Sequence, residues 1–171
     1  MEELKKIPEM YVKGKGVRFG SSRNGVKIME DVTDRVSIKS KGDMANFMKI
    51  VRLCFASHWA SQTLTVKKAA GNTTGMSISD MERILGESRT SVRTLLRWGK
   101  EKHIWRRDIF GNIVVNPTVI LLGRRVSATE YATYRDELKF LIGGKWKQML
   151  EAEYSEIREE YESDIVEEEA K

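Results

Sequence analysis

The chain has 171 residues, of which 40% are hydrophobic and 32% charged, and its formal net charge is +5. This length and composition predict one globular domain with an appendage, and they exclude collagen-like and disordered classes. No run of about 18 apolar residues is present, so we expect no membrane-spanning helix. The N-terminus lacks the apolar centre of a secretory signal peptide, which favours a cytoplasmic location.

The charge is unevenly distributed along the chain. Residues 150–171 contain ten Asp or Glu and two Lys or Arg, a net charge of −8. Residues 1–149 carry 28 basic and 15 acidic side chains, a net charge of +13. A body this basic attracts nucleic acid or another anionic surface. The acidic end is either a solvated helix or a segment that competes with the polyanion for the basic surface.

The N-terminal segment predicts only a small amount of regular structure. Residues 1–16 have little periodicity, whereas residues 17–39 contain short β-like runs. The dipeptide Asn24-Gly25 separates these runs and is typical of tight hairpin turns. We therefore expect a small antiparallel element before residue 41.

A helix is predicted over residues 42–60. Its apolar residues recur at helical spacing and form a wide face, and Asp43 is a candidate N-cap. Cys54, the one cysteine of the chain, lies on this apolar face, so we expect a buried thiol rather than a nucleophile. Residues 61–76 are polar and contain glycine, which predicts a connection with at most a short strand.

A helix-turn-helix follows, predicted from caps and breakers. Residues 77–86 favour a helix with a capping box of Ser79 and Glu82, and Gly86 ends it. Ser88 caps the next helix, which runs to about Lys102. Two capped helices separated by so short a turn are typical of DNA-binding proteins.

A β-hairpin is predicted directly after these helices. Residues 104–108 and 112–116 have the pattern of two short strands, and Gly111 and Asn112 can take positive φ at the turn between them. Pro117 cannot donate to a strand ladder and ends the second strand. A hairpin in this position is a wing.

The remaining sequence predicts a short apolar turn over residues 118–123 and two helices. Ser127 and Glu130 form a capping box that begins the first helix, and the glycines at 143–144 end it. The second helix begins near residue 145 and carries a narrow apolar stripe, typical of a packing seam: Trp146, Leu150, Tyr154, Ile157 and Tyr161. Three interpretations stay open: this helix packs on its own body, pairs two chains into a homodimer, or acts as an autoinhibitory mimic of DNA.

The second helix of the helix-turn-helix combines an apolar face with a basic one. Between Ser88 and Arg107 the chain has seven Lys or Arg and one Glu. Helical spacing turns Val92, Leu96 and their neighbours inward, which leaves Arg and Thr side chains outward. Arg bonds bidentately to guanine in the major groove, Thr and Ser reach base edges or phosphates, and a helix N-terminus favours phosphate.

The predicted DNA-binding residues lie on this helix and on the wing. Neighbouring strand residues point to opposite faces, so at most one of Arg106 and Arg107 contacts DNA. The full set is Ser88, Arg89, Thr90, Ser91, Arg93, Thr94, Arg97, Lys100, Arg106, Arg107 and Asn112. A solvated basic face is the alternative interpretation of the helix taken alone.

No catalytic motif is present in the sequence. The two histidines, His58 and His103, lie on different predicted elements and lack the spacing of metal ligands. No phosphate-binding glycine loop, metalloprotease motif or nucleophile motif occurs. We therefore expect no enzyme activity, no cofactor and no metal.

The chain resembles two nested groups of proteins. Residues 77–107 resemble the winged helix-turn-helix of bacterial and phage DNA-binding proteins, with core spacing at Val92, Leu96 and Ile104. They depart from it at Gly99, where a large apolar residue is common, and at Lys102 and His103, where a glycine usually ends the helix.

A narrower resemblance covers residues 17–125 and is to the RepL-type replication proteins of small plasmids and phages. It is carried by the Gly42-Asp43 pair four residues before Phe47 and by the Asn116-Pro117 pair before Gly123. This resemblance implies a protein that binds a replication origin in a bacterial host cell, and it supplies no catalytic residue.

The sequence thus predicts an α+β protein that is mainly α with small β elements. We expect an N-terminal lead-in and β element over 1–41, a winged helix-turn-helix domain over 42–125, and C-terminal helices with an acidic tail over 126–171. The predicted function is sequence-specific binding of double-stranded DNA as a non-enzymatic replication initiator. The alternatives are a transcriptional regulator on the same fold and an adaptor that binds host polymerase or helicase.

Overall fold

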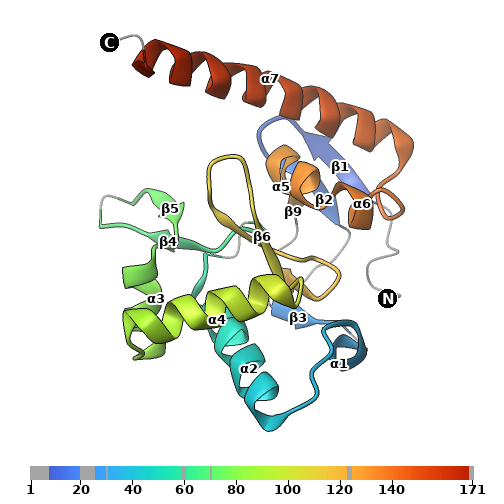
Figure 1. The fold of residues 1–171 in the computed structure, drawn as a ribbon. Coiled ribbons are helices and arrows are strands. Elements are labelled where there is room, and N and C mark those ends of the chain that lie inside the picture. The colour runs from blue at the N-terminus through green and yellow to red at the C-terminus, as the bar shows by residue number, and fades with distance from the viewer. Residues whose placement is uncertain are drawn as a thin grey trace.

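The computed structural model describes residues 8–19, 26–29, 31–58, 61–69, 71–122 and 125–169, which form an α+β protein, as predicted (Figure 1). None of the described helices is both long and apolar enough to cross a membrane. The elements in chain order are β1 (Pro8–Val12), β2 (Gly16–Phe19), β3 (Val26–Ile28), α1 (Val32–Arg35), α2 (Lys41–Ala56), β4 (Thr65–Lys67), β5 (Thr73–Gly75), α3 (Ile78–Leu85), α4 (Arg89–Glu101), β6 (Trp105–Arg107), β7 (Ile113–Val115), β8 (Ile120–Leu122), β9 (Arg125–Val126), α5 (Ala128–Thr133), α6 (Arg135–Leu138) and α7 (Gly144–Glu169).

The strands form small antiparallel sheets. β1, β2 and β9 make one sheet, and β3–β8, β4–β5 and β6–β7 pair separately. A short segment before β4 also joins β7: Thr63 bridges to Val114, and the Leu64 N–H donates to the Ile113 carbonyl oxygen at 2.9 Å. β7 therefore has β6 on one edge and residues 62–64 on the other.

The hairpin pairing indicated within residues 17–39 is wrong. β2 pairs with β1 and β9, and β3 pairs with β8, so the two runs belong to different sheets. Asn24-Gly25 lies outside the described residues. The predicted turn at 118–123 is also wrong in part, because Ile120–Leu122 form β8, a buried strand whose partner lies far away in sequence.

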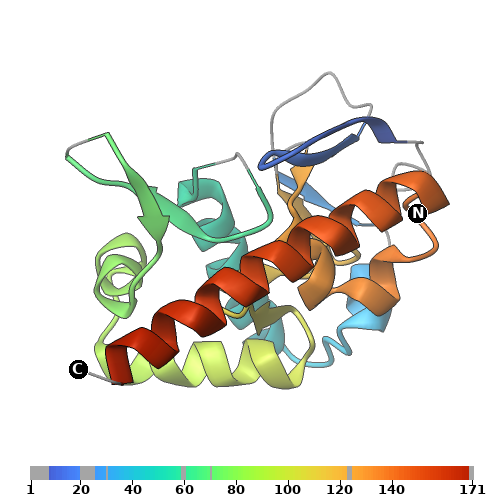
Figure 2. The same ribbon diagram turned by 90° about the horizontal axis from the view of Figure 1, so that it is seen from above.

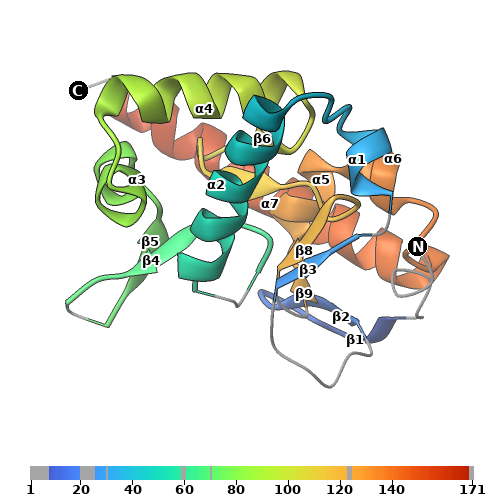
Figure 3. The same cartoon turned by 90° about the horizontal axis from the view of Figure 1, so that it is seen from below.

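The first core lies among α2, α3 and α4, which pack against one another (Figure 3). α2 and α4 meet at Ile50 and Gly99, where a Cβ atom on the glycine would lie 2.8 Å from Ile50 Cδ1. Its buried side chains include Phe47, Val51, Cys54, Met81, Val92, Leu95, Leu96, Ile104 and Trp105. The expectation that Cys54 is a buried thiol is confirmed, and burial raises the pKa of that thiol to about 12.

The caps of two helices differ from those predicted. α2 is capped by Ser40, whose hydroxyl accepts the Asp43 N–H, so Asp43 is the third residue of the helix and not its N-cap. α3 is capped in the same way by Ser77, with Asp80 as the reciprocal partner in place of Ser79 and Glu82. The N-cap of each helix lies two or three residues before the predicted one, because a Ser-x-x-Asp box satisfies the free N–H groups from there.

The second core joins β2 and β9 to the C-terminal helices and includes Val17, Val114, Val126, Tyr131, Leu138 and Leu150. The capping box of Ser127 and Glu130 is confirmed at the start of α5. The single helix predicted to reach residue 142 is instead divided into α5 and α6 at Tyr134, whose φ is −121°. The buried Tyr134 hydroxyl donates to the Val114 carbonyl at 3.1 Å, which ties the residue at the break to β7. Seen from above, α7 runs across the molecule (Figure 2).

Candidate nucleic-acid interface

The helix α4 is fixed to the body through one face. Ser88 caps it and Gly86, with a φ of 69°, ends the preceding helix, both as predicted. The indole N–H of Trp105 donates to the Leu96 carbonyl at 2.9 Å. A Cβ atom on Gly99 would lie 2.8 Å from that indole ring. The glycine at this position therefore makes room for a tryptophan of the following strand.

The C-terminal end of α4 uses a histidine in place of glycine. His103 has a φ of 57°, in the left-handed region, and its N–H donates to the Lys100 carbonyl at 3.0 Å. The next N–H, of Ile104, bonds the Gly99 carbonyl at 2.9 Å. The helix therefore ends at Glu101 with the hydrogen bonds that are usual where a glycine follows a helix. His103, unlike glycine, adopts this left-handed φ at a cost in free energy.

The opposite face of α4 is exposed. Every predicted DNA-binding residue of the helix and its cap is exposed: Ser88, Arg89, Thr90, Ser91, Arg93, Thr94, Arg97 and Lys100. Ser88 and Ser91 are partly engaged by capping, since the Ser91 N–H donates to the Ser88 hydroxyl at 3.3 Å. The remaining side chains of this face project into solvent.

The cations of this face have no acidic partner within the described part of the chain. Other basic residues do: Lys49 pairs with Glu87 at 2.6 Å and Arg135 with Glu151 at 2.6 Å. In contrast, neither an ion pair nor a side-chain hydrogen bond involves the four cations Arg89, Arg93, Arg97 and Lys100. Cations four residues apart on a helix repel one another, so this row is destabilising until an external anion approaches.

The two arginines of β6 point in different directions. Arg106 is half-buried: its Nη2 lies 2.6 Å from Glu137 Oε1, and its guanidinium lies 4.8 Å from the Tyr134 ring centroid. Arg107 is exposed, donates to the Gly111 carbonyl, and lies 5.6 Å from the Trp105 ring centroid. Arg107 is therefore the arginine of this strand that can reach an external ligand.

The turn of the β6–β7 hairpin is organised by Asp108. Its carboxylate accepts the N–H groups of Phe110 and Asn112, both at 2.9 Å. Gly111 has the predicted positive φ, of 78°, but Asn112 does not. The side-chain amide of Asn112 donates to the Asp108 carboxylate at 3.3 Å. Asn112 is half-buried against Gly75 of β5, so it supports the turn and is only partly open to a ligand.

Two buried polar residues, Gln62 and the capping-box residue Glu130, hold the hairpin region together. The Gln62 amide donates to the Val115 and Ile120 carbonyls, each at 3.0 Å, and thus links β7 to β8. Glu130 is 1% exposed and accepts the Thr63 N–H at 3.0 Å, the Thr63 hydroxyl at 2.9 Å and the Ser127 N–H at 2.8 Å. Burial raises the pKa of Glu130, against the opposing effect of these hydrogen bonds.

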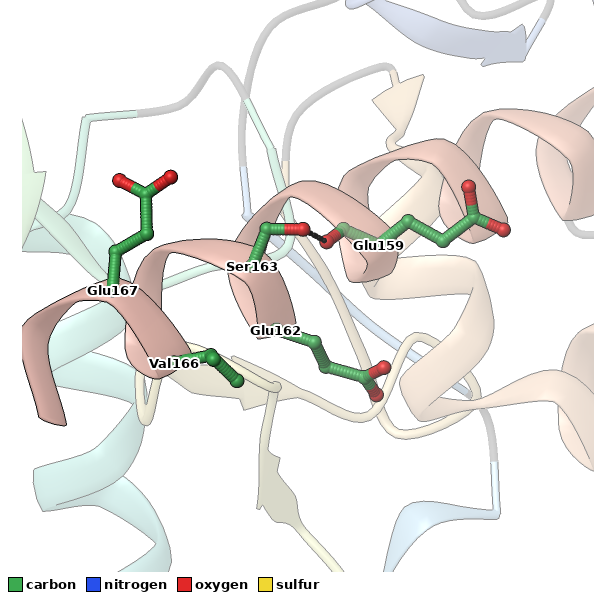
Figure 4. Close-up of a pocket in the computed structure, with 5 residues that line it drawn as sticks. All are labelled: Glu159, Glu162, Ser163, Val166 and Glu167. Atoms are coloured by element: carbon green, nitrogen blue, oxygen red, sulfur yellow. Dashed lines mark hydrogen bonds between the residues drawn. The ribbon is translucent and has the colours of Figure 1, made fainter. Parts of the chain in front are cut away.

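The hollows detected on α7 do not form a site for a small ligand. The one drawn in Figure 4 is lined by residues of α7 alone, and the Ser163 hydroxyl within it donates to the Glu159 carbonyl of the same helix at 2.8 Å. In the described ranges no three His, Cys, Asp or Glu side chains gather into a group that could hold a metal ion. A site lined from one side only gives no converging groups for catalysis.

The chain matches no protein-family model, no curated protein and no solved structure. The role of α4 and the β6–β7 hairpin is therefore inferred from their geometry and charge.

Proposed function

We propose that the chain binds double-stranded DNA through a winged helix-turn-helix, with α4 in the major groove and the β6–β7 hairpin as the wing. The observation that carries this proposal is the row of exposed cations on α4 that have no partner within the described residues. A row of like charges on a rigid helix is relieved by a polyanion, and Arg and Thr are the side chains that bond base edges.

The order of the elements supports the same proposal. α2 is followed by the strand-like residues 62–64, by the β4–β5 hairpin, by α3 and α4, and then by β6 and β7; apart from the β4–β5 hairpin, this is the order of a winged helix domain. The segment 62–64 lies on the far edge of β7 from β6, so the hairpin is anchored to the domain rather than free. An anchored hairpin holds Arg107 in a constant position relative to α4.

The finer proposal is that the DNA is a plasmid or phage replication origin, bound without any catalytic step. It rests on the resemblance of residues 17–125 to RepL-type replication proteins. A transcriptional regulator needs the same groove-reading helix, so footprinting distinguishes the two. Repeated protected sites beside an AT-rich segment support an initiator, and a single protected operator over a promoter supports a regulator.

Fluorescence anisotropy with the full-length protein tests DNA binding itself. Random duplexes and duplexes from around the protein's own gene are titrated across a salt series. We expect log K to fall steeply with log salt, with a sequence preference that survives at about 150 mM salt. Absence of binding at low salt would overturn the proposal and favour a protein partner, such as host polymerase or helicase, for the basic face.

A further inference from the structure

The N-terminal half of α7 is firmly attached to the body. Leu150 is fully buried in the second core, and Tyr154 and Ile157 pack against the same core. The carboxylate of Glu153, itself buried, accepts the Tyr11 hydroxyl and the Gly14 N–H, the latter at 2.7 Å. The β1–β2 turn therefore sets the direction of α7, and the apolar seam is occupied within the chain.

The C-terminal half of α7 reaches the tip of the β6–β7 hairpin. The Tyr161 ring meets the Phe110 ring edge-to-face, with centroids 5.2 Å apart and an interplanar angle of 82°. Figure 1 shows the hairpin extending from the region of α4 towards α7, so that the hairpin lies between the two helices. α7 thus touches the part of the hairpin that the proposed function places beside DNA.

Beyond Tyr161 the face of α7 that continues the seam carries the exposed Ile165 between two carboxylates. Asp164 and Glu168 follow Tyr161 by three and seven residues, so they lie on its side of the helix. Both are exposed, and neither has an ion-pair partner among the described residues. Residues 159–169 contain seven Asp or Glu and no Lys or Arg. This charge is the same in sign as a DNA backbone.

We propose that residues 159–169 of α7 form an autoinhibitory element for DNA binding. The contact of Tyr161 with Phe110 holds carboxylates beside the hairpin tip, where the phosphates of a bound duplex would pass. DNA has to displace this end of α7 or bind against its repulsion. The inference rests on the proposed function and adds regulation to it. A partner that captures the acidic end would release the DNA-binding face.

The test uses full-length protein and removes charge without removing the helix. The double variant Asp164→Asn/Glu168→Gln is compared with Asp31→Asn/Asp136→Asn, which makes the same change in net charge at exposed positions outside α7. We expect the first to bind duplex about fivefold more tightly than wild type at low ionic strength, and the second less than twofold. The tighter binding of the Asp164→Asn/Glu168→Gln variant should vanish in high salt, because screening removes repulsion between exposed charges.

A second variant tests the contact and not the charge. Tyr161→Ala keeps every carboxylate but removes the ring that meets Phe110, so it should also tighten binding. Amide hydrogen exchange in residues 159–169 of the wild-type protein should accelerate when DNA is added. Unchanged exchange on a bound complex, or equal affinities for the acidic double variant and its control, would overturn autoinhibition while leaving DNA binding intact. Failure of every variant to bind DNA would instead overturn the proposed function.

Discussion

α4 and α7 each pack on the body through apolar side chains, but they are attached in different ways. α4 buries four residues within 13, and its cap and C-terminal end are both closed by hydrogen bonds. α7 extends over 26 residues, and burial declines along it from the fully buried Leu150 to the half-buried Tyr161 and the exposed Val166. The helix with unpaired cations is therefore held rigidly, whereas the helix with unpaired carboxylates is held mainly at its start. Such a difference suits a fixed reading element and a displaceable regulator.

The largest expected effect comes from breaking the attachment of α4. Leu96→Ala removes a nearly fully buried side chain from the first core and should lower the free energy of unfolding by about 2–5 kcal/mol. Ile157→Ala, at a half-buried position of α7, should cost less than half as much. Urea denaturation of both variants measures the difference. Equal losses would contradict the assignment of α4 as the more firmly packed helix.

The attachment of the N-terminal half of α7 is tested by removing the buried carboxylate of Glu153. Glu153→Ala leaves the Tyr11 hydroxyl and the Gly14 N–H without their partner, which should cost about 1–3 kcal/mol of stability. Glu156→Ala, which removes only an exposed ion pair with Lys13, is the control and should cost clearly less, because solvent screens that pair. A loss for Glu153→Ala no greater than that of the control would show that the β1–β2 turn does not fix α7.

The proposed DNA-binding face of α4 is tested by binding energies. Arg93→Ala should weaken binding to the preferred duplex by about 1–3 kcal/mol and flatten the discrimination between duplexes. Lys100→Ala should weaken all duplexes about equally. Arg52→Ala removes an exposed arginine from α2 and is the control. Unchanged binding by Arg93→Ala would mean that a different face of the protein meets DNA.

We expect low pH to weaken the attachment of α4 and high pH to weaken the attachment of α7. Hydrogen bonds from the Lys39 N–H and then the Trp98 indole lower the pKa of Asp43 to about 2, so its support of α4 is present above its ordinary pKa of 3.8 and is lost as the pH falls towards 2. Burial and the bond to Glu153 raise the pKa of Tyr11 to about 12, so its support of α7 is present below pH 10 and is lost as the pH rises towards 12. Thermal unfolding across pH, with Asp43→Asn and Tyr11→Phe as non-titrating controls, measures both losses.

The sequence predicts the face of α4 because helical periodicity and caps are local. Pairings between distant segments cannot be predicted from such local patterns. β3 pairs with β8, for example, and each of these strands has only three residues, too few for a recognisable strand pattern. It also cannot show that Arg106 turns to Glu137, because that glutamate is 31 positions away. Gln62 becomes buried only when three segments meet, and nothing local marks it. The capping pattern marks Glu130, but it does not show that this carboxylate also bonds to Thr63, 67 positions away. The acidic end of α7 is evident from composition, but its contact with Phe110 is not.

The smallest expected effect concerns the last turn of α4. His103 has a φ of 57°, a conformation that costs a non-glycine residue about 1 kcal/mol or more. A glycine at this position removes that strain, but it also raises the conformational entropy of the unfolded chain, which lowers the stability of the protein by about 0.5–1 kcal/mol. His103→Gly should therefore stabilise the protein slightly, by about 0.5 kcal/mol. Lys102→Gly should destabilise it, because the φ of −82° at that position suits any residue. Urea denaturation measures the change in the free energy of unfolding for both variants. Changes of opposite sign would show that α4 retains a small strain at its end. A loss of stability in both variants would mean that His103 is not the residue with the left-handed φ.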